Sequence, residues 1–139
     1  MAGVDTIPEL LRPMMGKPSV KTDPKRCAVC GRSAGARIEA HHIVRRNAGT
    51  AYGPNGRELR KPTIDLCGFG SNLKDADGRC LCHGLAHHQM LHFRWAETSR
   101  SSSPYSGWEI IGGHWEYLRT MEPTDYQTAL GMKGWRKVR

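Results

Sequence analysis

The alternation of hydrophobic and polar positions predicts two strands in the first half of the chain. Residues 36–44 alternate loosely and contain β-branched side chains, and residues 62–67 form a second short run of the same kind. The stretch between them is rich in glycine, asparagine, proline and basic residues and is typical of a loop. The second strand would return Cys67 towards the cysteines that precede the first strand.

The pattern after the second strand predicts a loop, a helix and a hairpin. Residues 68–78 carry three glycines and several Asn and Asp residues, which favours a loop. Residues 82–95 fit a helix, with Leu85, Leu91 and Trp95 on its buried side. A Ser-rich break at residues 98–103 follows, and two β-prone runs then flank Gly112-Gly113, which indicates a β-hairpin.

These elements predict a small α+β protein with three regions. Residues 1–25 contain four prolines and scattered charge, so we expect a loose arm that buries little surface, in which Leu10 and Leu11 could dock as a short helical turn. Residues 26–95 would form the core. Residues 96–139 would comprise the Ser-rich linker, the C-terminal hairpin and a basic tail.

Composition narrows the class of partner. The chain has 21 Lys and Arg residues against 13 Asp and Glu residues, a formal net charge of +8, which favours a polyanion such as nucleic acid. Its 5 cysteines are an odd number, and their C-x-x-C and C-x-C spacings indicate metal binding in a reducing compartment, so we expect a cytoplasmic protein. No apolar run approaches the length of a membrane span.

The cysteine spacing predicts a structural zinc site. Cys27, Cys30 and Cys67 supply three ligands, and either Cys80 or Cys82 supplies the fourth; we favour Cys82.

The histidines exceed what one structural site can use, so a second metal is expected. His41 and His42 are adjacent on a predicted strand and face opposite ways, which assigns them different tasks. His83 and His87 are four residues apart and share a helix face. We expect His41 to bind a metal with these two, while His42 stays free to take a proton from water.

Other histidines offer a competing assignment. His88 and His92 are also four residues apart and could replace the helix pair; otherwise we expect both to be exposed at the surface. His114, within the predicted hairpin, is expected to be a surface or packing residue.

The chemistry that these groups support is hydrolysis of phosphodiesters. A zinc protease would need Glu at position 84, which is Gly, and the P-C-x-x-C motif that a zinc deaminase needs together with H-x-E does not occur. Five basic side chains of the loop between the strands could hold a phosphate backbone without reading bases: Arg45, Arg46, Arg57, Arg60 and Lys61.

Three motifs between Cys27 and Phe93 carry a resemblance to a known family. They are Ala40-His-His-Ile-Val44, Asp65-Leu-Cys-Gly-Phe-Gly70 and Cys82-His-Gly-Leu-Ala-His87. Together they resemble the HNH endonucleases, in particular the compact phage and bacterial members. The arm and the C-terminal hairpin lie outside this resemblance.

The resemblance implies a ββα-metal fold, also called a His-Me finger, in which a hairpin and a helix hold one catalytic divalent ion and a four-cysteine zinc knuckle braces them. It implies that His41, His83 and His87 are metal ligands and that His42 is the general base. It also implies products with a 5′-phosphate.

The chain departs from the family at one position. Many members carry an Asn shortly before the Leu-Cys pair, where this chain has Pro62 and Thr63, and Asn55 or Asn72 would have to substitute. The stretch between Cys67 and the next cysteines is also longer than the family pattern leads us to expect.

The sequence therefore predicts a metal-dependent HNH endonuclease of low sequence specificity that cleaves DNA, with RNA as an alternative substrate. We expect structural Zn²⁺ and one catalytic ion among Mn²⁺, Ni²⁺, Co²⁺, Zn²⁺ and Mg²⁺, with Mg²⁺ disfavoured by three nitrogen ligands. The resemblance to phage members adds the hypothesis of a DNA-packaging role with a guiding protein, in the cytoplasm of a bacterial host. The alternative is a non-catalytic zinc-knuckle protein that binds nucleic acid.

Overall fold

The structure is a computed structural model that describes residues 4–33, 37–102 and 109–138. Short helices and antiparallel sheets make the chain an α+β protein. The elements, in chain order, are the 3₁₀-helix η1 (Glu9–Met14), strands β1 (Ile38–His42) and β2 (Thr63–Cys67), helix α1 (Cys82–His87), strands β3 (Leu91–Ser102) and β4 (Glu109–Arg119), helix α2 (Tyr126–Leu130) and strand β5 (Arg136–Lys137).

Parts of the predicted elements lie outside the described residues. These parts are the first three residues of the arm, Ala36 of the first strand, residues 103–108 from the end of the Ser-rich break to the start of the predicted hairpin, and the terminal Arg139.

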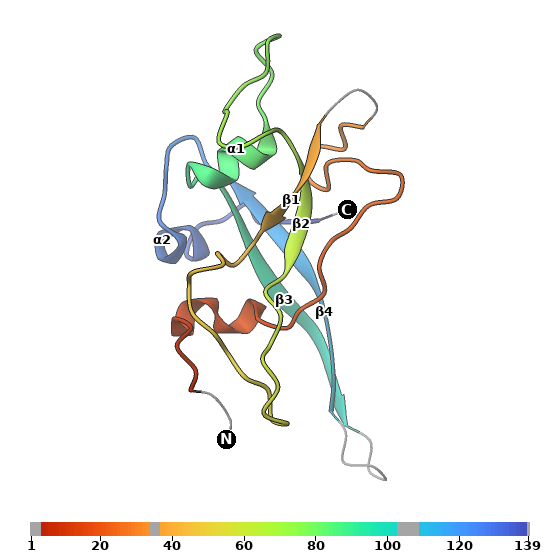
Figure 1. Cartoon of the computed structure of the whole chain (residues 1–139), viewed down its shortest axis with the longest axis vertical. Helices are drawn as coiled ribbons and strands as arrows, with labels where there is room; N and C mark the ends of the chain where they lie inside the picture. The colour runs from red at the N-terminus through yellow and green to blue at the C-terminus, as the bar shows by residue number, and fades with distance from the viewer. Residues whose placement is uncertain (1–3, 34–36, 103–108, 139) are drawn as a thin grey trace.

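The two strands predicted in the first half of the chain are confirmed within two residues at each end. β1 and β2 pair antiparallel, with His41 opposite Ile64 and His42 opposite Thr63. A second antiparallel sheet has the order β3-β4-β5. In Figure 1 the β1–β2 pair lies across the long β3–β4 ribbon, and α1 lies at one end, where it contacts both β2 and β3.

The helix predicted over residues 82–95 is much shorter than expected. α1 ends at His87, and Gln89 then adopts a φ of 58°, a left-handed conformation that a helix cannot continue through. From Leu91 the chain is a strand, with Leu91 and Phe93 buried against the core. Leu91, Phe93 and Trp95 are spaced two residues apart, which is the period of a strand, and this segment pairs with β4.

The hairpin predicted around Gly112-Gly113 is wrong: the two runs that flank these glycines belong to one strand, β4, which pairs with β3 instead. Both glycines lie inside β4, opposite Ser99 and Glu97, and the register shifts between those two β3 residues. The Ser-rich segment predicted as a linker is therefore part of β3 as far as Ser102. Glycine is needed at position 113 because a Cβ there would lie 2.6 Å from the Ala96 carbonyl oxygen.

The N-terminal arm buries more surface than its prolines predict. Ile7, Met14 and Met15 are all buried in the common core. Val20 forms a parallel bridge with Ile64 of β2. Leu10 and Leu11 lie in a short helical turn, the 3₁₀-helix η1, as the sequence suggested. Apolar residues between the prolines thus attach the arm to the sheet.

The core is a single cluster that joins both sheets. Ile64 and Leu66 of β2 are fully buried, as is Val44 just after β1, and Trp115 of β4 packs with them. The Trp115 indole nitrogen donates to the Pro18 carbonyl oxygen at 2.7 Å, which fastens the arm to the β3–β4 ribbon. None of the described helices is both long and apolar enough to cross a membrane.

The close packing at Gly113 gives a stability prediction. Gly113→Ala should lower the free energy of unfolding by about 1–3 kcal/mol, because the added methyl group must displace the Ala96 backbone or the Trp95 ring. Gly131→Ala is the matched control: its φ is −85° and its Cβ would lie 3.6 Å from the nearest atom, so stability should change by less than about 1 kcal/mol. Urea unfolding of both variants measures the difference. Equal effects would contradict the packing described for β4.

Candidate metal centres

Four cysteine sulfurs converge where the segment between the arm and β1 meets β2 and α1. The ligand atoms of Cys27, Cys30, Cys67 and Cys82 all lie within 4.8 Å of one another. The sulfurs of Cys30 and Cys67 are 3.6 Å apart, close to the roughly 3.8 Å expected between two thiolates that bind one zinc tetrahedrally at about 2.3 Å. This cluster could bind a structural metal such as zinc.

The backbone around these cysteines supports their role as ligands. Gly31 has a φ of 80°, and its amide donates to the Cys27 carbonyl at 2.9 Å, which closes the turn that aims Cys27 and Cys30 at one point. The Cys82 amide donates to the Cys67 sulfur at 3.4 Å. Such N–H contacts stabilise negative charge on a thiolate.

Charge is unevenly shared among the four sulfurs. Hydrogen bonds from Cys30, Cys67 and Cys82 hold the pKa of the Cys27 thiol far below its ordinary value. Donation to Cys27 in turn raises the pKa values of Cys67 and Cys82. A divalent ion bound among them would deprotonate all four, because the metal replaces the shared protons.

The choice between Cys80 and Cys82 falls on Cys82. Cys82 is buried as the first residue of α1, beside Cys67. Cys80 lies outside the cluster, in a bridge with Lys74, and its sulfur accepts a hydrogen bond from the Arg119 guanidinium at 3.2 Å. The connection between β2 and α1 thus places Cys82, and not Cys80, at the cluster.

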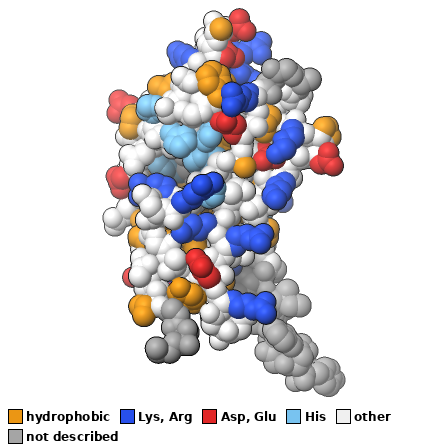
Figure 2. Space-filling view, in the orientation of Figure 1, with side chains coloured by type: hydrophobic (Ala, Val, Ile, Leu, Met, Phe, Trp, Pro, Cys, Tyr) orange, Lys and Arg blue, Asp and Glu red, His pale blue; other side chains and the backbone are white. Residues whose placement is uncertain are grey.

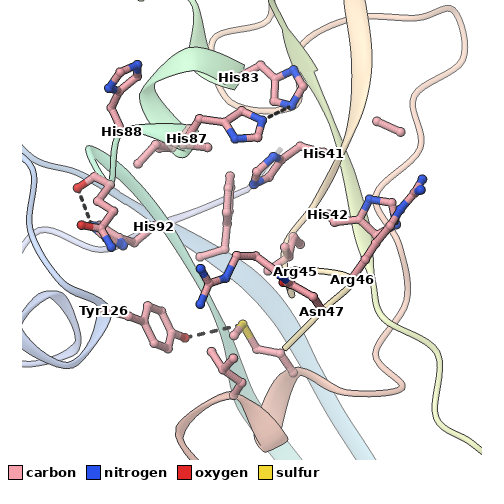
Figure 3. A pocket seen from close by; sticks show the side chains of 18 of the residues that line it. His41, His42, Arg45, Arg46, Asn47, His83, His87, His88, His92 and Tyr126 are labelled. Atoms are coloured by element: carbon pink, nitrogen blue, oxygen red, sulfur yellow. Dashed lines mark hydrogen bonds between the residues drawn. The ribbon is translucent and has the colours of Figure 1, made fainter. Parts of the chain in front are cut away.

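A second cluster consists of three histidines. One ligand nitrogen each from His41, His83 and His87 lies within 4.8 Å of the others. The Nε2 atoms of His83 and His87 are 3.1 Å apart, near the roughly 3.4 Å between two nitrogens that bind one ion tetrahedrally at about 2.1 Å. The His41 ring stands edge-on to both, with centroids 5.1 Å and 5.3 Å away. Figure 3 shows the three rings turned towards one another.

Two imidazoles of this cluster, those of His41 and His87, have lowered pKa values, which favours the neutral form that a metal ligand needs. Burial, together with charge repulsion from the neighbouring His83, His87 and His42, lowers the pKa of His41 to about 3. Burial and the proximity of His83 also lower the pKa of His87. Lone pairs are therefore available to a cation at neutral pH.

Glu39 orients one of these rings, and the sequence reading missed it. Its Oε1 atom lies 3.0 Å from Nδ1 of His83 and also accepts the Gly70 amide at 3.1 Å. A carboxylate there favours the tautomer in which Nδ1 carries the proton and Nε2 faces the cluster. Its position two residues before His41 on β1, hence on the same strand face, was the available signal.

Helix α1 is held close to the loop before it by a glycine. A Cβ on Gly84 would lie 1.8 Å from the Asn72 carbonyl oxygen, so no other residue fits without movement of the loop.

The two asparagines that could replace the family Asn are both used within their own turns. The side chain of Asn72 donates to the Phe69 carbonyl at 3.0 Å. Asn55 likewise accepts the Arg57 amide in its own turn. Neither asparagine points to the histidine cluster through these bonds.

His42 lies beside the cluster and outside it. Its Nε2 accepts a hydrogen bond from Nε of Arg46 at 3.4 Å. In Figure 3 His42 and Arg46 lie together on the opposite side of β1 from the His83 and His87 rings. Burial lowers the pKa of His42, and the charges of Arg46 and Lys61 lower it further. The ring is therefore neutral at physiological pH.

The competing histidines are not part of this cluster. His88 is exposed and its Nε2 lies 3.0 Å from the Ser71 carbonyl oxygen. His92 is buried in β3, not exposed as predicted, and its Nε2 donates to the Gln89 carbonyl at 2.9 Å. Because α1 ends before His88, the two residues share no helix face. His114 is paired with Glu116 at 3.2 Å.

The predicted basic residues divide into two groups. Arg45 and Arg46 line a pocket together with the histidine cluster. Lys61 is nearby, since its Nζ donates to the Arg46 carbonyl at 2.9 Å. Arg57 and Arg60 are exposed on the loop between β1 and β2 and do not line the pocket. Figure 2 shows the histidines gathered on one face, with Lys and Arg side chains next to them.

The cysteine cluster gives a prediction about zinc content. Cys82→Ser should lose the structural zinc and lower the melting temperature strongly, because a small domain depends on such a site for stability. Cys80→Ser should keep both values near those of the unmodified chain, since Cys80 lies outside the cluster. Elemental analysis and thermal unfolding measure these effects. Zinc loss in the Cys80 variant would contradict the assignment of Cys82 as the fourth ligand.

The histidine cluster gives a prediction about a second metal. His87→Ala should weaken Co²⁺ binding by roughly 100-fold or more, because it removes one of three nitrogen ligands. His88→Ala is the matched control, being the next residue and outside the cluster. A Co²⁺ titration followed by absorbance, on protein whose thiolate-bound zinc has been retained, reports both. Equal affinities in the two variants would argue against a metal held by His87.

Comparison with known proteins gives no match: neither a protein-family model, nor a curated protein, nor a solved structure is similar to this chain.

Proposed function

We propose that the chain is a metal-dependent nuclease in which β1, β2 and α1 form a ββα-metal site like that of the HNH endonucleases. The observation that carries this proposal is the convergence of three imidazole nitrogens within 4.8 Å, next to a fourth imidazole that is not among them. A purely structural site would use all its neighbours as ligands and would be closed to solvent.

The histidine cluster has the features of a working metal site. It offers three protein ligands, which leaves at least one position of a tetrahedral ion open. His87 is exposed, so solvent and substrate can reach that position. A divalent ion held there would neutralise negative charge that develops on a phosphodiester. Its all-nitrogen protein ligands favour Mn²⁺, Co²⁺ or Ni²⁺ over Mg²⁺.

His42 is the group that would take a proton from the attacking water. Its Nε2 lone pair is available because the ring is neutral, and Arg46 contacts it only at 3.4 Å, a long distance for a hydrogen bond. A phosphate oxygen is a better acceptor for the Arg46 guanidinium than an imidazole. Substrate binding would therefore draw Arg46 away and leave His42 free to act as the general base.

The charged surroundings suit a nucleic-acid substrate. Arg45 and Arg46 line the pocket beside the histidines, and their guanidinium groups can hold phosphate oxygens on either side of the scissile bond. These contacts read the backbone and not the bases, so cleavage would have low sequence specificity. A guiding partner would be needed for any precise target.

The mechanism predicts a specific effect of replacing the base. His42→Ala should reduce cleavage of supercoiled plasmid with Mn²⁺ by roughly 100-fold or more. Metal content and DNA retention should stay near those of the unmodified chain, because His42 is not among the clustered ligands.

His114→Ala is the control for this assay, since His114 pairs with Glu116 away from the pocket. Addition of a chelator should stop cleavage by the unmodified chain. Loss of metal in the His42 variant would mean that the roles of His41 and His42 are reversed. Absence of cleavage in the unmodified chain, with DNA binding retained, would favour the non-catalytic zinc-knuckle protein instead.

A further inference from the structure

The pocket beside the histidine cluster continues well past it. Its volume is about 710 Å³, within the range of roughly 300–1,000 Å³ that suits small organic ligands. Its far wall comes from outside the β1–β2–α1 unit: Leu11 and Met14 belong to η1, and Pro123 and Tyr126 belong to the segment that enters α2. These flanking segments turn a surface site into a walled pocket.

The far wall is held together by specific contacts. The hydroxyl of Tyr126 donates to the Met14 sulfur at 3.5 Å, which joins α2 to η1. The Thr124 amide donates to the Gln89 carbonyl at 2.9 Å, which ties the same segment to the end of α1. Because burial raises the pKa of Tyr126 to about 12, the hydroxyl is neutral. The wall is therefore in place before any ligand binds.

The two ends of the pocket differ in chemistry. The near end has the histidine cluster, and Arg45 points into the pocket between that cluster and the Tyr126 ring (Figure 3). The far end is largely apolar, with the half-buried ring of Tyr126 beside Leu11 and Met14. His92 also lines it, with its ring centroid 6.2 Å from that of Tyr126. The charged near end fits a phosphate, and the flat apolar far end fits a ring that can stack on an aromatic side chain.

We propose that the pocket receives one unstacked nucleobase, next to a phosphate held at the histidine cluster. The phosphate half of this inference rests on the proposed function. A base inside a duplex cannot enter such a pocket, because it would first have to leave the stack. The favoured substrate class is thus single-stranded or locally unpaired nucleic acid, with Tyr126 as the residue that receives the base.

Binding to matched probes tests this inference without any cleavage. All chains carry His42→Ala, and fluorescence anisotropy compares a thymidine strand of about 12 nucleotides with an abasic strand that has the same number of phosphates. The thymidine strand should bind roughly tenfold more tightly than the abasic strand. It should also bind more tightly than a duplex of equal length, although charge density alone favours the duplex.

Variants of the aromatic wall make the test specific. Tyr126→Ala should remove most of the preference for bases, whereas Tyr126→Phe should keep it because the ring does the stacking. Tyr52→Ala is the control, since Tyr52 is a part-exposed tyrosine that does not line the pocket. Competition by free thymidine monophosphate separates recognition of a mononucleotide from recognition of a strand. Displacement of the strand at equal concentration of nucleotide units would assign the pocket to free nucleotides and overturn the substrate class.

Equal affinity for the thymidine and abasic strands would overturn the inference, as would equal effects of the Tyr126 and Tyr52 alanine variants. The strand comparison needs no substitution at Tyr126, so it decides the question even where Tyr126→Ala unfolds the chain. If the chain that retains His42 prefers the strand with bases but does not cleave plasmid, the nuclease proposal is wrong and the base pocket stands. If it cleaves plasmid but shows no preference for bases, the base pocket is wrong and the nuclease proposal stands.

Discussion

The convergence of four cysteine sulfurs is the constraint on which the rest of the structure depends. Cys27 and Cys30 precede β1, Cys67 ends β2 and Cys82 begins α1, so one cluster joins three segments that are far apart in the sequence. α1 has only 6 residues, too few to be stable as an isolated helix. Its direction is fixed by the cluster and by the packing of the buried residues around it, and that direction brings two histidine rings over β1.

The sequence was sufficient where a local pattern decided the structure. β1 and β2 follow from alternation over a few residues, and three of the four clustered cysteines follow from their spacing. The sequence left Cys80 as an alternative to Cys82, and the fold places Cys82 in the cluster. The end of α1 was missed although a local signal was present: Leu91, Phe93 and Trp95 recur at every second residue, the period of a strand. Their strand conformation depends on hydrogen bonds to β4, a partner more distant in sequence than any window used for periodicity.

Long-range packing also explains the two other main differences. The sequence predicts a loose arm because prolines interrupt its apolar runs. In the structure Ile7, Met14 and Met15 are nevertheless buried in the core that β2 and the β3–β4 ribbon form. The pocket has the same origin, since Tyr126 reaches Met14 across more than a hundred residues of chain. Glu39 differs from these cases. The sequence predicts that it shares a strand face with His41, but only the structure shows its contact with His83, from which its role in orienting that ring follows.

Two adjacent histidines acquire different properties from strand geometry alone. His41 faces the interior of the site, where burial and the other imidazoles keep it neutral with a pKa of about 3. His42 faces the rim, where partial burial and the charges of Arg46 and Lys61 also lower its pKa. The cations that would gather phosphate are thus among the groups that keep His42 unprotonated, so attraction for a polyanion and readiness to accept a proton are favoured by the same charges. In the proposed nuclease, a single strand would supply both a ligand and a base because its side chains alternate.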